Sequence, residues 1–412
     1  MLYFSVIMFF LALTAQHRGP MSSNVSALWF FISWLPGELP WLFAAIQVVG
    51  TFLFIVLSTS SELKEISSLI VGLITLVMWF KLHLKTLRSG QVLQTSLHEE
   101  LGENFESTLT GIGITSPAIT HKHDWLYPFR YKRPGVERLQ NIIYGNAERN
   151  RLDIYRAAEV AQNKSPRPVV LHVHGGAWVI GNKHQQAQPL INYLAVNGWI
   201  CVDINYRLAP HDLYPACLVD VKKAIAWIKE NIENYGGDPS FIAVTGGSAG
   251  GHLCTLAALT GNASGFQPDF ESIDTHVNAV VSVYGVYDFT NYHDDNSSIR
   301  RFLELYVMPK TFLENLENWE IASPLFQISE MNLPTFIIHG DKDCVVSVKQ
   351  AQNFVQALRQ KNKAPVVYAE LPGAQHGFDI FHSVRTEFHV EAVGKFLNYC
   401  YTRHKNCDDA LA

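Results

Sequence analysis

A glycine-rich turn near the middle of the chain restricts the possible fold more than any other segment. The short apolar run Phe241–Val244 is typical of a strand, and Ala249–Leu259 has the composition of a helix. Between them lies Gly246-Gly247-Ser248-Ala249-Gly250, where glycines on both sides of Ser248 permit a tight, strained turn. The segment therefore predicts a strand, a sharp turn and a helix, with one serine hydroxyl held at the bend.

Short β-rich runs alternate with helical stretches on both sides of this turn. The predicted strands are Leu139–Tyr144, Leu152–Tyr155, Val169–Val173, Ile200–Ile204, Phe241–Val244, Ala279–Val283, Thr335–Ile338 and Val366–Leu371. The predicted helices are Gln188–Val196, Cys217–Glu233, Ala249–Leu259, Val348–Gln360 and Thr386–Tyr401. This alternation implies an α/β fold, with a mostly parallel eight-stranded sheet and helices on both of its faces. A polar, aromatic-rich insertion over 287–328 interrupts the alternation and is expected to form a small cap.

The first ninety residues contain apolar runs that predict membrane-spanning helices. Trp41–Leu57 and Ile66–Phe80 carry no charge and approach the roughly 20 residues needed to cross a bilayer. Leu2–Ala15 is shorter, at the length of a signal-peptide core, and Met21 is an alternative start of the chain. Buried core helices are the alternative interpretation of these runs. We expect two to three membrane helices within residues 1–90.

The distribution of charge predicts the orientation of these helices and bears on partners. Lys81, Lys85 and Arg88 follow the last apolar run, whereas the loop before it carries only Lys64, between two glutamates. By the positive-inside rule, this favours a multi-pass membrane protein with a cytoplasmic C-terminal domain. The net charge of −5 and the lack of a basic tract give no reason to expect nucleic acid as a partner.

A serine hydroxyl needs a base within hydrogen-bonding reach, and the sequence supplies candidates after two later strands. His376 follows the last predicted strand in a glycine-flanked loop and is the candidate base. Asp341 and Asp343 both follow the strand Thr335–Ile338, where a carboxylate can orient that histidine. Either aspartate gives the chain order serine, aspartate, histidine, which is the order of the α/β-hydrolases.

A second glycine pair lies in His174-Gly175-Gly176-Ala177-Trp178, at the end of the predicted strand Val169–Val173. Glycines at this place let bare backbone N–H groups approach a ligand closely. Such a loop accompanies the G-x-S-x-G turn in esterases and lipases. The amides of Gly175, Gly176 and Ala249 are therefore predicted to form an oxyanion hole.

From about Asn141 to the C-terminus, the chain resembles the α/β-hydrolase fold, and specifically serine esterases and lipases similar to hormone-sensitive lipase. The resemblance is carried by HGGAW (174–178), YRLAP (206–210), GGDP (236–239), GGSAGG (246–251), HGDKD (339–343) and QHGF (375–378). It implies hydrolysis of carboxylic esters without a metal or an organic cofactor. It also implies Ser248 as the nucleophile, His376 as the base and Asp343, in preference to Asp341, as the acid.

Three departures from the hormone-sensitive lipase pattern bear on the substrate. Ala177 replaces the third glycine of the loop, Gly247 stands where an acidic residue usually precedes the nucleophile, and the acid lies in an H-G-x-x-D context. With the hydrophobic N-terminus, these traits resemble membrane-bound mycobacterial-type carboxylesterases and prenylcysteine methylesterases. The HGGAW loop also resembles that of kynurenine formamidases, which leaves an amidase, formamidase or small peptidase, as an alternative. A non-catalytic hydrolase fold used as a binding module is a further alternative.

These expectations divide the chain into three parts. Residues 1–90 form the membrane region, 91–125 a linker or cap segment, and 126–412 the catalytic domain. The expected function is a membrane-anchored serine carboxylesterase or lipase. Its partners are a small-molecule or lipid ester and the bilayer.

Overall fold

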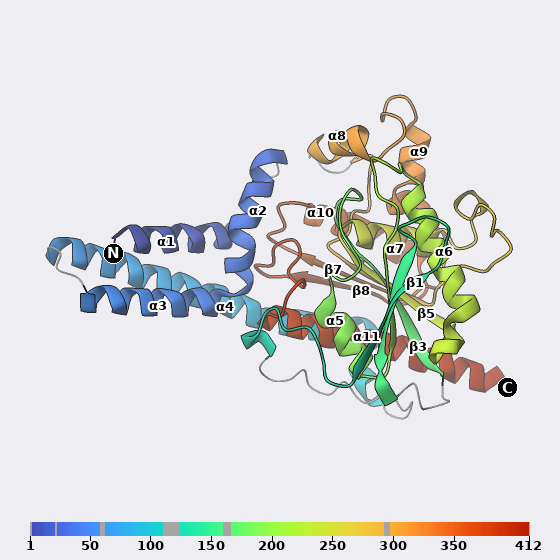
Figure 1. Cartoon of the computed structure of the whole chain (residues 1–412), viewed down its shortest axis with the longest axis horizontal. Helices are drawn as coiled ribbons and strands as arrows, with labels where there is room; N and C mark the ends of the chain where they lie inside the picture. Colours follow the sequence, from blue (N-terminus) through green and yellow to red (C-terminus); the bar gives the residue numbers. More distant parts are fainter. Residues whose placement is uncertain are drawn as a thin grey trace.

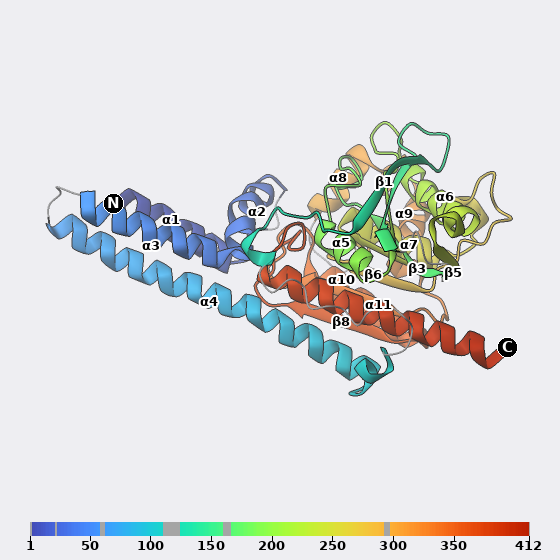
Figure 2. The same cartoon turned by 60° about the horizontal axis from the view of Figure 1, so that its bottom comes forward.

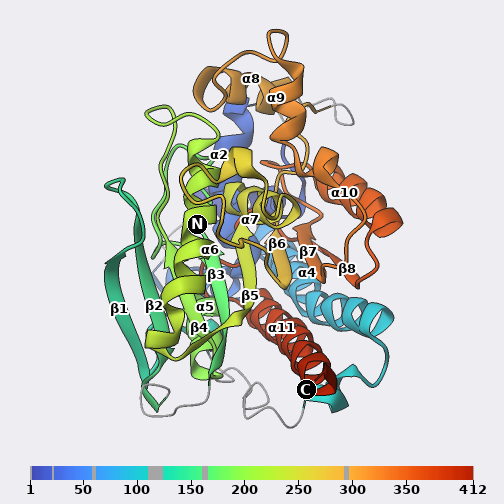
Figure 3. The same cartoon turned by 90° about the vertical axis from the view of Figure 1, so that its right-hand side faces the viewer.

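The predicted sheet is present in the computed structural model, which describes residues 2–20, 23–57, 62–109, 124–159, 166–291 and 297–411. Within these residues, eight strands form one sheet in the order β1-β2-β4-β3-β5-β6-β7-β8. The strands are β1 (Val136–Ile143), β2 (Arg151–Ala157), β3 (Arg167–Val173), β4 (Ile200–Ile204), β5 (Gly237–Gly247), β6 (Ala279–Val283), β7 (Thr335–Gly340) and β8 (Val366–Leu371). β2 is antiparallel to both β1 and β4, and all other neighbours are parallel. The prediction of a mostly parallel eight-stranded sheet is confirmed, and Figure 3 shows it from β1 at one edge to β8 at the other.

Helices cover both faces of the sheet because alternate strand residues point to opposite sides. Val169 and Leu171 of β3 belong to a core shared with α6 (Ala216–Asn231) and α7 (Ala249–Leu259). Val170, between them, belongs to a second core with α5 (Gln188–Val196) and α11 (Val384–Leu411). A smaller core joins α10 (Val348–Lys361) to β7 and β8. Residues buried on both faces account for the near-continuous apolar strands.

The insertion between β6 and β7 carries short helices above the strand ends. These are α8 (Ser297–Tyr306) and α9 (Leu316–Ile321), which lie at the top of Figure 1. The described 3-10 turns are η1 (Phe105–Leu109), η2 (Asp124–Leu126), η4 (Ile232–Tyr235), η5 (Ser264–Phe266) and η6 (Pro324–Gln327).

Four helices precede the sheet: α1 (Leu2–Gln16), α2 (Ser23–Glu38), α3 (Pro40–Leu57) and α4 (Glu62–Leu101). α1, α3 and the first half of α4 run side by side away from the sheet, and α2 lies crosswise at the end nearest to it (Figures 1 and 2). Two described stretches, Pro40–Leu57 and Ile66–Leu101, are long and apolar enough to cross a membrane. Their most apolar windows are only 11% and 28% buried, a small share for core helices of a soluble domain.

α4 continues to Leu101, into the segment expected from residue 91 onward to be a linker or a piece packed over the next domain. Leu93 and Leu97, four residues apart on one helical face, are buried in the core shared with α11. Gln94 lies on the exposed side. The mixed composition that indicated a linker is thus the amphipathic pattern of a helix on the surface of the sheet domain.

Candidate active site

Ser248 stands at the bend between β5 and α7. Its backbone angles are φ 57° and ψ −122°, a conformation that residues with a side chain rarely adopt. A Cβ at Gly247 would lie 2.7 Å from the ring of Tyr284, and a Cβ at Gly250 would lie 1.9 Å from the carbonyl oxygen of Val173. The packing around the turn therefore requires glycine on both sides of the serine.

Asp343 and His376 meet beyond the ends of β7 and β8. His376 Nδ1 lies 2.7 Å from Asp343 Oδ2. Asp343 Oδ1 accepts hydrogen bonds from the amides of Val345 and Val346, both at 2.8 Å. His339 Nε2 lies 3.3 Å from Asp343 Oδ2 as well. The carboxylate is thus fixed in position by both of its oxygens.

The surroundings of Asp343 also fix its charge. Burial alone would raise the pKa of Asp343, but the charge of His376 and hydrogen bonds from His339 and His376 hold it well below its usual range. The carboxylate is therefore ionised at neutral pH and can hold a proton on Nδ1 of His376. Asp341, the other candidate, accepts a hydrogen bond from the amide of Gly373 at 2.7 Å, away from His376.

The loop after β3 packs directly against the serine turn. A Cβ at Gly175 would lie 2.7 Å from the carbonyl oxygen of Gly247. Gly176 has φ 121°, and a Cβ there would lie 2.1 Å from the carbonyl oxygen of Ile180, so only glycine fits. The amide of Gly175 donates to Gln186 Oε1 at 2.6 Å. This amide is thus already engaged, which distinguishes it from the amides of Gly176 and Ala249.

His252 connects Trp178 of this loop to the insertion, and no sequence motif indicated this contact. Trp178 Nε1 donates to His252 Nδ1 at 3.2 Å, and His252 Nε2 donates to the carbonyl oxygen of Ala322 at 2.7 Å. Burial lowers the pKa of His252 to about 4, so the imidazole is neutral and can accept the indole hydrogen. Trp178, α7 and the insertion that carries α8 and α9 are linked through this one histidine.

An apolar pocket of about 200 Å³ adjoins Ser248. Side chains from the β3 loop, the insertion, the β7 loop and α2 line it: Ser26, Ala177, Trp178, Val286, Ile299, Phe302, Leu303, Val345 and Val346. Its walls are suited to the apolar part of a small molecule, with Ser248 as the reactive polar group.

Helix α2 is the part of the site that no sequence motif indicated. Trp34 Nε1 donates to the carbonyl oxygen of Gly377 at 2.9 Å. Gln375 Nε2 donates to Ser33 Oγ at 3.2 Å, and the ring of Phe30 lies 6.3 Å from the ring of His376. Helix α2 therefore contacts the loop that holds His376 from the side of the N-terminal region.

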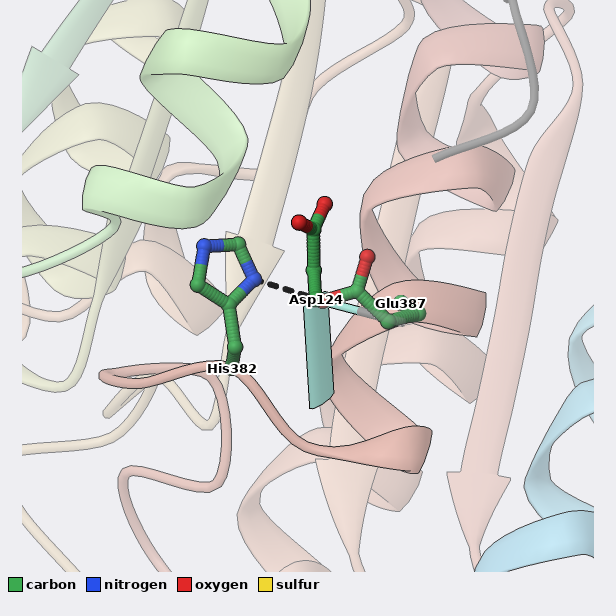
Figure 4. A group of neighbouring side chains, drawn as sticks. All are labelled: Asp124, His382 and Glu387. Atoms are coloured by element: carbon green, nitrogen blue, oxygen red, sulfur yellow. Dashed lines mark hydrogen bonds and ion pairs between the residues drawn. The ribbon is translucent and has the colours of Figure 1, made fainter. Parts of the chain in front are cut away.

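A separate group of side chains, Asp124, His382 and Glu387, has the spacing of metal ligands (Figure 4). His382 Nδ1 lies 2.6 Å from Glu387 Oε1, and Asp124 Oδ1 accepts from Arg133 at 2.8 Å. These residues belong to η2, the loop before α11 and α11 itself, not to the strand ends around Ser248. Because each group has a protein partner, we assign them a structural role.

The comparison with known families matches the central part of this architecture. Residues 152–358, half of the chain, match the BD-FAE family. The chain belongs to the BD-FAE family of α/β-hydrolases. It is 46% identical over 324 residues to Esterase LipQ of Mycobacterium tuberculosis, which covers 77% of this chain and 76% of LipQ. The resemblance to mycobacterial-type carboxylesterases is thereby confirmed.

Other relatives of this α/β-hydrolase match a smaller part of the chain. Probable carboxylic ester hydrolase LipM of Mycobacterium tuberculosis is 48% identical over 275 residues, 66% of this chain, but the match spans only 64% of LipM. Isoprenylcysteine alpha-carbonyl methylesterase ICME of Arabidopsis thaliana is 29% identical over 53% of this chain and 52% of its own. A solved structure, "Truncated form of carbohydrate esterase from gut microbiota", covers 63% of this chain and 96% of its own at 25% identity and a TM-score of 0.53.

Proposed function

We propose that this α/β-hydrolase is a membrane-anchored serine carboxylesterase that works through an acyl-enzyme on Ser248. The observation that carries the proposal is the pairing of Asp343 with His376 at 2.7 Å, at the same end of the sheet as the strained serine turn. The esterase and carboxylic ester hydrolase relatives support the reaction class.

In the proposed reaction, Ser248 Oγ attacks the carbonyl carbon of the ester while His376 Nε2 takes the hydroxyl proton. Asp343 holds the Nδ1 proton and stabilises the imidazolium that forms. The tetrahedral intermediate then expels the alcohol, which receives the proton from His376. Water, activated by His376, attacks the acyl-enzyme in the same way and releases the acid.

The negative charge on the tetrahedral intermediate needs hydrogen-bond donors that are free in the resting enzyme. We assign this role to the amides of Gly176 and Ala249, with the amide of Ala177, which lines the pocket beside Ser248. Ala249 begins α7, where backbone N–H groups have no partner within the helix. Gly175 has a different role here, because its amide holds Gln186 and so fixes the loop.

Membrane anchoring is supported by the N-terminal helices. Large apolar side chains are exposed along α3 and α4, among them Val48, Phe52, Val56, Leu73 and Phe80. Such faces are unstable in water and stable in lipid. Lys81, Lys85 and Arg88 favour a multi-pass arrangement with the catalytic domain in the cytoplasm. Protease digestion of sealed vesicles tests this orientation, and a catalytic domain on the external face would contradict it.

The test of the reaction compares wild type with Ser248→Ala, and uses Ser264→Ala, an exposed serine in η5, as the matched control. We expect Ser248→Ala to abolish both hydrolysis of p-nitrophenyl butyrate and labelling by a fluorophosphonate, while Ser264→Ala retains both. Unchanged turnover in Ser248→Ala would refute the proposed nucleophile. Faster cleavage of a matched anilide than of the ester would instead identify an amidase.

A further inference from the structure

Helix α2 has two faces with different surroundings. Ser26, Phe30, Ser33 and Trp34 point to the sheet domain, where they line the pocket or contact the His376 loop. At 100° per residue, these positions occupy one side of the helix. This side belongs to the active site.

The opposite side of α2 is exposed and apolar. Val25, Leu28, Phe31 and Ile32 are 51%, 62%, 70% and 38% exposed. From Val25 to Gly37 the helix contains no charged side chain. A helix between a protein core and water carries polar residues on its outer side, so a helix that is apolar all round requires an apolar medium there.

The place of α2 in the fold indicates which medium this is. α2 ends at Glu38 and α3 begins at Pro40, so the chain turns directly from α2 into the first candidate span. α2 lies crosswise at the end of the α1–α3–α4 bundle that faces the sheet domain (Figure 1). With α3 and α4 across a bilayer, α2 lies along the bilayer surface, on the side of the catalytic domain.

We propose that the outer face of α2, defined by Val25, Leu28, Phe31 and Ile32, lies in the boundary between lipid headgroups and acyl chains. The ester then reaches Ser248 from the bilayer, along the helix that forms a wall of the pocket. The substrate class is a membrane-resident amphiphilic ester whose apolar part enters the pocket beside α8. This inference rests on the proposed esterase activity for the substrate, but the position of α2 can be tested without it.

Fluorescence quenching tests the position of α2 independently of catalysis. Leu28→Cys in a Cys407→Ser background is labelled with an environment-sensitive fluorophore, and the full chain is reconstituted in phosphatidylcholine vesicles with or without brominated acyl chains. We expect at least a twofold loss of fluorescence for the label at 28. The control is Leu313→Cys, an exposed position (93%) between α8 and α9, which we expect to be unaffected. Equal quenching at both positions, or none at 28, contradicts the inference.

Kinetics test the route of the substrate. The double variant Val25→Glu/Leu28→Glu is compared with Leu313→Glu on p-nitrophenyl acetate in solution and on 4-methylumbelliferyl palmitate dissolved in vesicles. We expect the double variant to hydrolyse the vesicle ester at least tenfold more slowly and the soluble ester within twofold of wild type. An equal loss on both esters would assign α2 a purely structural role. If the wild-type protein cleaved neither ester, the esterase proposal would be refuted. The quenching experiment would still test the position of α2 independently.

Discussion

The indole of Trp34 donates its hydrogen to the carbonyl oxygen of Gly377, the residue that follows His376, at 2.9 Å. The two residues lie 343 positions apart in the chain. Through this bond, a helix of the N-terminal region helps to set the conformation of the loop that carries the proposed catalytic base.

Trp34→Phe tests this relationship, because phenylalanine keeps a ring beside Phe30 and Phe381 but has no donor. A hydrogen bond of this kind contributes about 1 kcal/mol, so we expect kcat to fall about fivefold with little change in KM. Trp227→Phe, on the partly exposed side of α6, is the control. Equal kcat values for wild type and Trp34→Phe would show that the loop holds its conformation without α2.

Gln186→Ala removes the acceptor that engages the amide of Gly175. The loop after β3 then loses a fixed point next to the proposed oxyanion donors, and we expect kcat to decrease about tenfold or more, as for loss of precise donor placement. The adjacent Gln185 is exposed, and Gln185→Ala is the matched control. A higher kcat in Gln186→Ala would mean that the freed Gly175 amide itself binds the oxyanion.

Gly176→Ala is expected to destroy the loop, since the new Cβ would lie 2.1 Å from the carbonyl oxygen of Ile180 at a φ of 121°. The expected result is a loss of at least about 100-fold in kcat/KM, the scale of a lost oxyanion donor. Gly265→Ala places its Cβ in open space and is expected to be neutral in activity and in melting temperature. Activity in Gly176→Ala similar to Gly265→Ala would contradict the assigned role of the loop.

Two buried histidines and Asp343 are expected not to influence the pH dependence of kcat/KM near neutral pH. Burial lowers the pKa of His174 to about 3 and that of His252 to about 4, and the pKa of Asp343 lies well below its usual range. These groups keep their protonation states above about pH 5, so we expect kcat/KM measured between about pH 6 and 8 to show no titration of His174, His252 or Asp343.

His252→Gln tests whether His252 acts by holding Trp178 in place or by changing its own protonation state. We expect a lower kcat, because Trp178 loses its partner, and an unchanged midpoint of the acid limb. A shifted midpoint would show that His252 itself contributes to the pH dependence.

The ion pair of Glu38 with Arg385 connects the end of α2 to the start of α11, and both side chains are fully buried. Arg385 Nε also donates to Ser89 Oγ of α4 at 3.1 Å. Burial already raises the pKa of Glu38 to about 7 with Arg385 present, so in Arg385→Met the carboxyl takes up a proton, and we expect the lost hydrogen bonds to cost about 1–3 kcal/mol in the free energy of unfolding. Lys229→Met breaks an exposed pair with Asp274 and is expected to cost less than about 1 kcal/mol. Denaturant titration in detergent measures both.

Much of the sheet could be predicted because its signals are local. Most of the strands contain a short apolar run, whereas β1 includes Glu137 and Arg138, and α5 and α7 have the predicted bounds. The turn at Ser248 could also be predicted from its flanking glycines, because few other residues are compatible with such a strained turn. β5 starts at Gly237 instead of Phe241, since Gly237 pairs with Arg167, although Asp238 and Pro239 follow it.

The contacts between distant segments could not be predicted in this way. Nothing near Trp34 in the sequence indicates Gly377, and nothing near Gln186 indicates that its amide oxygen accepts from Gly175. The helical course of α4 beyond residue 91 could not be predicted for a related reason: Leu93 and Leu97 are too sparse for an apolar run, and only the packing of α11 shows why they are apolar. These contacts depend on packing between segments that are far apart in the chain, and such packing cannot be inferred from a single sequence.

The uninterrupted course of α4 has a mechanical consequence. Its 40 residues correspond to a rod of about 60 Å at 1.5 Å per residue. One half is part of the α1–α3–α4 bundle, and the other is joined to α11 and, through Glu100 and the amide of Val366 at 2.9 Å, to β8. The bundle and the sheet therefore share a stiff element instead of a hinge. Because α4 connects the two parts, the position of Ser248 relative to the bundle is fixed by the fold.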